Sequence, residues 1–172
     1  MDGHTGAVTA VGVVPLPDGR VLLATGSDDR TVRLWDPIAG TAAGEPLIGH
    51  TGQVTAMAVV PLPDGRTLLA TGSHDHTVRL WDPIAGTPVG GPLTGHTSRL
   101  AAAVAVPLSG GRVLLATGSK DCTVRLWDPT TGAAIDQLAL GDQVAGIAAD
   151  QDRLFIATRN GLTAMQVSLP SR

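Results

Sequence analysis

The chain has 172 residues, a net charge of −3 and 43% hydrophobic residues. This composition is typical of a globular protein with its own hydrophobic core and not of a disordered one. Charged residues of both signs are spread along the sequence, so there is no basic stripe for nucleic acid and no polybasic patch for an anionic membrane.

The only cysteine is Cys122. A single thiol excludes an internal disulfide and a cysteine-based zinc site, and it fits a reducing compartment. The N-terminal residues lack the basic and apolar regions of a secretory signal, and no apolar run approaches the ~18 residues that span a bilayer. We therefore expect a cytoplasmic protein.

Two dipeptides recur every 46 residues. Gly-His begins at residues 3, 49 and 95, and Trp-Asp begins at residues 35, 81 and 127. Residues 3–48 and 49–94 are identical at 36 of 46 positions, which indicates a recent duplication. Residues 95–140 diverge more, and a degenerate fourth unit covers 141–172. Such a period indicates a single domain, residues 1–172, built from stacked supersecondary units.

The elements predicted for the first unit are short strands. Residues 8–14 form an apolar, β-branched run that ends in the turn residues 15–19. A second apolar run covers 21–25, residues 31–35 alternate between apolar and polar, and a weaker segment follows at 42–47. The short connections exclude parallel crossovers, so the strands form an antiparallel meander. No segment has helical periodicity, and 34 of 172 residues are Gly or Pro, which favours an all-β fold.

The first strand of each unit is apolar on both faces but built from small residues, such as Val8, Ala10 and Gly12. A strand that is flanked by neighbouring sheets on both faces has this composition. Small side chains also suit a position where several sheets crowd toward a common axis.

The unit resembles the repeat of the WD-repeat β-propeller family: Gly-His, followed by Ala-Thr-Gly-Ser-x-Asp-x-Thr-Val-Arg-Leu-Trp-Asp, recurs three times in register. The resemblance covers residues 3–167 and implies blades of four antiparallel strands. It therefore implies a half-propeller with three complete blades and a degenerate, three-stranded fourth. The Ala-, Gly- and Leu-rich composition suggests a bacterial source.

The resemblance also implies a buried hydrogen-bonded tetrad in each blade. The matching residues, with the same spacing of 21, 4 and 6 in each unit, are His4, Thr25, Asp29 and Trp35; His50, Thr71, Asp75 and Trp81; and His96, Thr117, Asp121 and Trp127. Indole donates, hydroxyl and imidazole donate and accept, and carboxylate accepts, so the four groups satisfy one another.

The fourth unit departs from this pattern. Its expected strands are 143–149, 153–158 and 162–167, and the tail 168–172 is too short for an outer strand. Asp142 stands at the expected His position, Thr158 is expected to keep the hydroxyl position, and Asn160 and Met165 fall near the other two. We expect this blade to be held by packing alone and to be the weakest.

Three chemical alternatives have weaker support. A His, Thr and Asp set evokes a nucleophilic triad, but it recurs three times with a Trp attached, which favours a structural role. His74, Asp75 and His76 evoke a metal site, but the other units have different residues in that turn, so we expect no metal and no cofactor. Cys122 lies in the same turn and is expected to be an incidental thiol.

Family resemblance places partner contacts on the top face, at the start of the inner strand and in the turn before the tetrad Asp. The candidates by position are Asp28, Gln53, Thr55, His74, Arg99 and Lys120, with Ala7, Thr9 and Ala101 at equivalent places. Interface hot spots favour Trp, Tyr and Arg, and only Arg99 fits that preference.

The expected function is a non-catalytic scaffold for protein–protein interaction. Closed rings of this family need six to eight blades, and an open half-ring exposes apolar faces, so we expect self-association into an eight-bladed homodimeric ring. An alternative is a C-terminal sensor or regulatory fragment of a larger multidomain signalling protein. A propeller enzyme is disfavoured because the inner-strand positions hold Val, Ala, Gly, Thr and Met, which do no acid–base chemistry.

Overall fold

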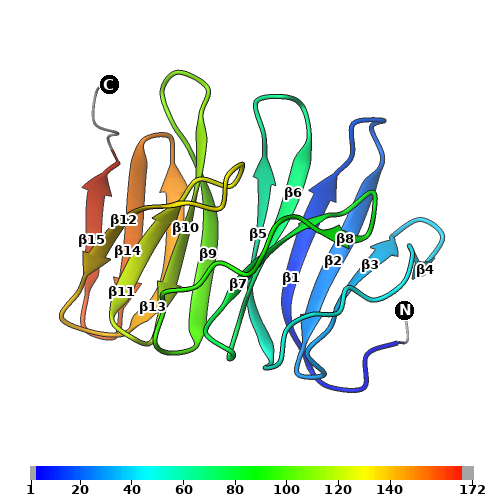
Figure 1. Ribbon diagram of the computed structural model, residues 1–172, viewed down its shortest axis with the longest axis horizontal. Coiled ribbons are helices and arrows are strands. Elements are labelled where there is room, and N and C mark those ends of the chain that lie inside the picture. Colours follow the sequence, from blue (N-terminus) through cyan, green and yellow to red (C-terminus); the bar gives the residue numbers. More distant parts are fainter. Residues whose placement is uncertain (1–2, 168–172) are drawn as a thin grey trace.

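The computed structural model describes residues 3–167, which form four antiparallel β-sheets packed face to face in a row (Figure 1). We call the sheets blades 1 to 4 in chain order. Blade 1 contains β1 (Val8–Pro15), β2 (Val21–Ser27), β3 (Val32–Asp36) and β4 (Thr41–Ala42). Blade 2 contains β5 (Val54–Pro61), β6 (Thr67–Ser73), β7 (Val78–Asp82) and β8 (Thr87–Pro88).

Blade 3 contains β9 (Leu100–Pro107), β10 (Val113–Ser119), β11 (Thr123–Trp127) and β12 (Ala134–Ala139). Blade 4 contains β13 (Val144–Asp150), β14 (Arg153–Thr158) and β15 (Leu162–Gln166). Each sheet keeps its strands in sequence order, so three four-stranded meanders and one three-stranded meander are confirmed. The expectation for the tail 168–172 falls outside the described residues. The described part of the chain contains no helix, and therefore none that is long and apolar enough to cross a membrane.

The first strand of each blade lies at the inner edge of the row. Strands β1, β5, β9 and β13 contact one another consecutively, as their small residues predict. Each inner strand turns back through a short hairpin. In blade 1, Gly19 adopts φ +84°, and the Asp18 carboxylate accepts hydrogen bonds from the backbone amide and Nε of Arg20. This combination of Asp and a left-handed Gly is a common way to close such a turn.

The outer strands are shorter than the segment expected at 42–47. Strands β4 and β8 contain two residues each. The chain rejoins the sheet only at isolated bridges between Leu47 and Val32 and between Leu93 and Val78. The prolines in these segments lack an N–H, and glycines such as Gly44 take left-handed conformations, so a longer ladder cannot form. In blade 3, where residues 134–139 contain neither, β12 forms a full six-residue strand.

The core lies between consecutive blades. We call the face of a blade that packs on the preceding blade its front face, and the opposite face its rear face. One apolar cluster joins the rear of blade 1 to the front of blade 2. A second cluster joins blades 2 and 3, and a third joins blades 3 and 4. Each blade therefore depends on its neighbours for most of its burial, as expected for a repeat protein.

Candidate functional site: buried tetrads and the top face

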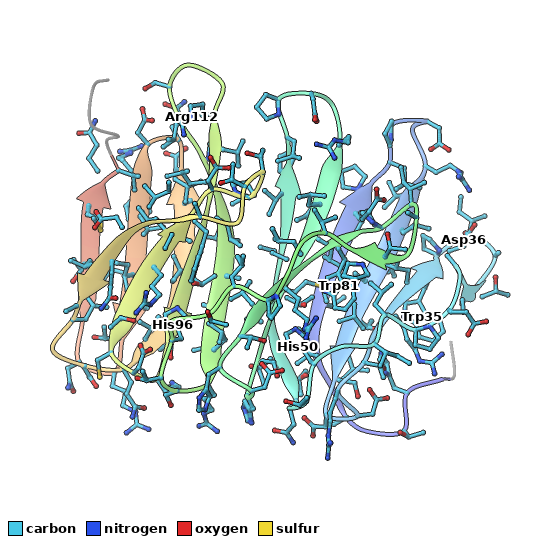
Figure 2. The ribbon with its side chains drawn as sticks, viewed as in Figure 1. Trp35, Asp36, His50, Trp81, His96 and Arg112 are labelled. Carbon is cyan, nitrogen blue, oxygen red and sulfur yellow. The ribbon has the colours of Figure 1, made fainter. Side chains whose placement is uncertain are left out.

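The predicted tetrads form in blades 1, 2 and 3 with nearly identical geometry. In blade 2, Trp81 Nε1 donates to Thr71 Oγ1 at 2.8 Å, and Thr71 Oγ1 lies 2.9 Å from His50 Nε2. His50 Nδ1 lies 2.9 Å from Asp75 Oδ2. Figure 2 shows His50 and Trp81 side by side, and their ring centroids lie 6.4 Å apart in an edge-to-face arrangement.

The pattern of donors fixes the protonation of the imidazole. Because Asp75 can only accept, His50 Nδ1 carries the proton, and Nε2 accepts from the Thr71 hydroxyl. The hydroxyl then accepts from the indole, so each of the four side chains in the tetrad has a hydrogen-bond partner. Thr71 and Trp81 are almost fully buried, which requires such satisfaction.

A second set of polar residues completes each network, and the tetrad prediction did not include it. The Thr77 hydroxyl donates to Asp75 Oδ1 at 2.7 Å, and the amides of Thr77 and Thr51 donate to the same carboxylate. Ser73 Oγ accepts from the Asp75 amide at 3.0 Å. The equivalent residues in the other two blades are Thr5, Ser27 and Thr31, and Thr97, Ser119 and Thr123. Their recurrence in each of the first three units was the signal in the sequence.

These contacts shift the pKa values of the three tetrad carboxylates and of His96. Burial raises the pKa of Asp121, but hydrogen bonds from Thr123, the Thr97 amide and His96 outweigh burial and lower that pKa to about 2. The same balance holds the pKa values of Asp29 and Asp75 well below their usual range. Burial lowers the pKa of His96, although its bond to Asp121 opposes the shift. The network therefore contains ionised carboxylates and, in blade 3, a histidine that resists protonation.

An arginine beside each tetrad packs under the Gly of the Gly-His pair. A Cβ on Gly49 would lie 3.0 Å from Arg79 Nη1, so only glycine fits there without a shift. Arg33 and Arg125 occupy the same place in the other two blades, and the Nε atom of each of the three is buried without a hydrogen-bond partner among residues 3–167.

The fourth blade lacks a tetrad, and its register corrects two of our assignments. In blade 2, the tetrad residue Thr71 pairs with Met57, and Ser73, two residues later, pairs with Val54. In blade 4, Thr158 pairs with Val144 and Ile156 pairs with Ile147. Thr158 therefore takes the place of Ser73 and not that of the tetrad threonine, which is replaced by Ile156.

The remaining tetrad positions of blade 4 follow from the same register. Met165 pairs with Leu154 as Trp81 pairs with Leu69, which confirms Met165 at the indole position. His50 lies four residues before Val54, the first residue of β5. The equivalent of Val54 in blade 4 is Val144, and the residue four positions before it is Leu140 and not Asp142. Asp142 instead accepts from Asn160 Nδ2 at 2.7 Å on the surface. Leu140, Ile156 and Met165 belong to one apolar cluster, so packing replaces the hydrogen bonds.

The residues predicted for the top face lie together at one rim, along the lower edge of the row in Figure 1. Backbone hydrogen bonds pair them in each blade: the amides of Asp28, His74 and Lys120 donate to the carbonyls of Ala7, Gln53 and Arg99. Two of the candidates connect blades. Thr55 Oγ1 donates to Leu100 O at 2.8 Å, and Lys120 Nζ donates to Val144 O at 3.0 Å. Thr9 makes the equivalent bond to Val54 O.

The other four candidates, Asp28, Gln53, His74 and Arg99, have no side-chain hydrogen bond within residues 3–167. Partial burial and the nearby charge of Arg99 lower the pKa of His74, while Asp28 opposes the shift. Of the six candidates, the charged ones are Asp28 on blade 1 and Arg99 and Lys120 on blade 3, and Arg30 is exposed in the same turn as Asp28.

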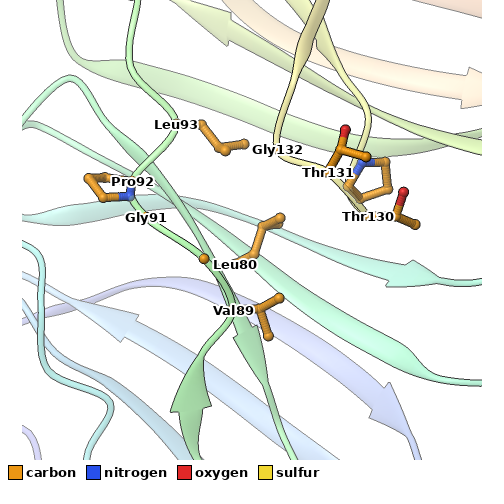
Figure 3. Close-up of a pocket in the computed structure, with 10 residues that line it drawn as sticks. Leu80, Val89, Gly91, Pro92, Leu93, Thr130, Thr131 and Gly132 are labelled. Atoms are coloured by element: carbon orange, nitrogen blue, oxygen red, sulfur yellow. The ribbon is translucent and has the colours of Figure 1, made fainter.

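A cavity of about 270 Å³ lies at the outer side of the molecule, between the segment after β8 and the turn after β11 (Figure 3). Its lining includes Leu80, Val89, Leu93 and the Thr130–Gly132 turn, and it has no ionisable side chain. It therefore offers no group for acid–base chemistry. Residues 3–167 also contain no group of three His, Cys, Asp or Glu side chains placed to hold a metal ion.

Comparisons with known proteins agree with this geometry. The family model described as "WD domain, G-beta repeat" matches residues 1–36, 44–82 and 86–128. A solved structure described as "Structure of U3-55K" is similar with a TM-score of 0.82 and 21% identity, over 96% of this chain and 50% of that chain. This likeness supports the fold alone, and the chain spans about half the length of that neighbour. No curated protein sequence matches. The chain belongs to the WD40-repeat family, and its four sheets are propeller blades.

Proposed function

We propose that this chain is a non-catalytic WD40 scaffold that presents its top face to a protein partner. Members of this family generally serve as protein-interaction scaffolds. The observation that carries the proposal is a difference in hydrogen bonding between the buried polar residues and those on the top face. The tetrads bond the buried His, Thr, Asp and Trp side chains to one another, while Asp28, Gln53, His74 and Arg99 lie on one rim without a side-chain hydrogen bond within residues 3–167.

The charge on the rim narrows the partner's chemistry. Asp28 lies on blade 1 and Arg99 on blade 3, with the neutral Gln53 and His74 between them. Complementary charges across an interface fix the orientation of a partner. We therefore expect a protein surface that places a basic group over blade 1 and an acidic group over blade 3.

Proximity labelling in cells that express the natural gene product tests this function. Arg99→Glu reverses one charge of the rim, and Arg66→Glu makes the same change at the opposite rim, where Arg66 pairs with Asp64 in an exposed turn. Proteins lost with Arg99→Glu but retained with Arg66→Glu would support the proposal. The same labelled set for both variants, each with an unchanged denaturation midpoint, would contradict it.

The homodimeric ring expected from the sequence remains a prediction about assembly. Light scattering on the purified chain checks it. Twice the mass of the 17.5 kDa chain is the expected result, and a stable, non-aggregating monomer would exclude the dimer.

A further inference from the structure

Asn160 is the only asparagine among the 172 residues, and Gly161 follows it directly. Both residues are exposed in the turn between β14 and β15, at the rim that carries the top-face candidates (Figure 1). Asn160 lies two residues after Thr158, just as the tetrad residue Asp75 lies two residues after Ser73. The turn of blade 4 therefore holds a side-chain amide where the earlier blades hold a tetrad carboxylate.

Asparagine is a thermolabile residue, and a glycine after it presents no side chain that blocks attack by its own backbone nitrogen. In such a pair, the Gly161 nitrogen loses its proton to water and attacks Asn160 Cγ. An N–C bond forms, the Cγ–Nδ2 bond breaks, and the side-chain nitrogen takes up a proton and leaves as ammonia. Water then opens the resulting succinimide ring at either carbonyl and gives aspartate or isoaspartate. The net reaction consumes water, releases ammonia and involves no oxidation or reduction.

The turn leaves the reacting atoms unobstructed. Within residues 3–167, the Gly161 amide has no hydrogen-bond acceptor, and a Cβ built on Gly161 would meet no atom within 4 Å. The Gly161 carbonyl, in contrast, accepts from the Thr158 amide at 2.9 Å, which holds the turn together. Water therefore reaches both the Gly161 nitrogen and the Asn160 side chain while the chain is folded.

The hairpin turn of blade 1 shows the opposite arrangement at the other rim. It contains an Asp–Gly pair, but the Gly19 amide donates to Leu16 O at 3.0 Å. The hydrogen bond from Arg20 lowers the pKa of Asp18, so this carboxylate stays ionised and is a poor target for a backbone nitrogen. The equivalent turn of blade 2 has the same contacts. These turns protect their Asp–Gly pairs, whereas the turn of blade 4 does not protect Asn160.

The Asn160 side chain also joins two segments of blade 4. Its Nδ2 donates to Asp142 Oδ2 at 2.7 Å, which links the turn 158–161 to the segment 140–143 that leads into β13. A cavity of about 320 Å³ lies between these segments, and its lining includes Leu140 and Leu162. The hydrogen bond therefore spans a space that side chains leave unfilled.

An aspartate at position 160 would lack the donors that hold a tetrad carboxylate. The Asp75 carboxylate lies against His50 Nδ1 and accepts from the Thr77 hydroxyl. In blade 4, Leu140 takes the place of the histidine, and the side chain that faces position 160 is the acidic Asp142. Conversion thus replaces a hydrogen bond by two carboxylates that repel each other. Arg159 is the only basic residue of the turn, and an ion pair at such an exposed site contributes little.

We propose that Asn160 is a modification site that converts spontaneously to aspartate and isoaspartate in the folded chain, and that its product separates the turn 158–161 from the segment 140–143. Water is the only co-reactant, so the converted fraction increases with the age of the molecule. Each conversion adds a negative charge to the top face at blade 4. The proposal does not depend on what the top face binds.

Intact mass spectrometry of the folded chain during storage at mildly alkaline pH tests the modification. We expect a mass gain equal to the exchange of an amide for a carboxyl group, located in the tryptic peptide that begins at Asn160. Isotopically labelled water during digestion identifies conversion that occurs only after cleavage. Gly161→Val is the matched control: the site has open space and no left-handed φ, and the β-branched side chain should slow conversion at least about tenfold.

Two results would overturn the modification site. The first is a folded chain that keeps its mass over the period in which the urea-unfolded chain converts, because the folded turn would then protect Asn160. The second is an equal rate for the native chain and Gly161→Val, because the gain would then not come from attack by the backbone nitrogen of residue 161.

Hydrogen exchange tests the structural consequence on variants that imitate the product. Asn160→Asp should speed exchange of the β13 amides at least about threefold and leave β1–β3 unchanged. Asn160→Ala, which removes the bond without adding a charge, should have a smaller effect. Asn160→Asp combined with Asp142→Asn exchanges donor and acceptor and should restore the native rate. Native exchange in Asn160→Asp would exclude the separation of the two segments, and equal acceleration in the double variant would exclude repulsion as its cause.

Discussion

The indole of Trp81 gives the most direct test of the buried networks. It is 1% exposed and packs against the rear face of blade 1, in a cluster with Val32 and Leu34. Its Nε1 also donates to the fully buried Thr71 hydroxyl. Trp81→Ala removes the packing and the hydrogen bond, whereas Trp81→Phe removes the hydrogen bond but keeps most of the packing.

The structure sets the expected magnitudes. Truncating a buried Trp to Ala costs about 3–5 kcal/mol in the free energy of unfolding. Thr71 keeps its bond to His50 and loses only one donor, which adds about 1 kcal/mol. We therefore expect a loss of about 4–6 kcal/mol for Trp81→Ala. For Trp81→Phe we expect about 1–2 kcal/mol, since only the donor and part of the ring are lost.

Urea denaturation followed by far-UV circular dichroism measures both losses without depending on the fluorescence of the deleted indole. Ile84→Ala, at a site 68% exposed, is the matched control and should change the stability by less than about 0.5 kcal/mol. A loss below about 1 kcal/mol for Trp81→Ala would refute the packing role assigned to the indole. Equal losses for the Ala and Phe variants would refute the division between packing and hydrogen bonding.

Three further predictions follow from particular contacts. Gly72→Val should lower the free energy of unfolding by about 1–3 kcal/mol, because its Cβ meets Leu100 at 2.8 Å, whereas Gly91→Ala, with open space around it, should be neutral in the same urea assay. Lys120→Met should speed hydrogen exchange in β13–β15 and leave β1–β3 unchanged, because it removes the bond to Val144 O; uniform acceleration would contradict this local role. Stability should fall as the pH drops below 6.5, because unfolded His96 takes up a proton more readily than folded His96, and again between pH 3.8 and about 2, where Asp121 stays ionised only when folded. A urea midpoint that does not change between pH 7 and pH 3 would exclude both contributions.

The sequence predicted blades 1 to 3 closely because their constraints are local and repeated. His, Thr, Asp and Trp recur at constant spacing, and each strand alternates between its two faces, so pattern and geometry agree. The outer strands were overestimated because Pro46 and the left-handed Gly44 allow only a two-residue ladder in blade 1.

Blade 4 was partly misassigned because counting residues from Gly141 does not follow the strand pairing. Relative to the earlier blades, its entry loop is shorter, and this moves Leu140 to the histidine position. Thr158, which lies two residues after the true tetrad position, was therefore assigned as the tetrad threonine. Only cross-strand register distinguishes Ile156 from Thr158, and register depends on pairing that spacing alone does not specify.

The structural roles of Thr55 and Lys120 were also not predictable from the sequence. Their acceptors, the carbonyls of Leu100 and Val144, lie 45 and 24 residues away on the next blade. Position in the repeat placed both residues on the top face, but only the packing of adjacent blades shows that their polar atoms are already bonded.

These bonds between blades have a mechanical consequence. The hydroxyls of Thr9 and Thr55 and the ammonium of Lys120 each donate to the carbonyl of the first residue of the next inner strand. Each pair of adjacent blades is therefore connected by a hydrogen bond to the inner strand of the later blade. The angle between adjacent blades is then fixed at their inner strands, and the outer strands and turns have little influence on it. Outer turns can consequently gain, lose or exchange residues during evolution while the angle between adjacent blades is kept.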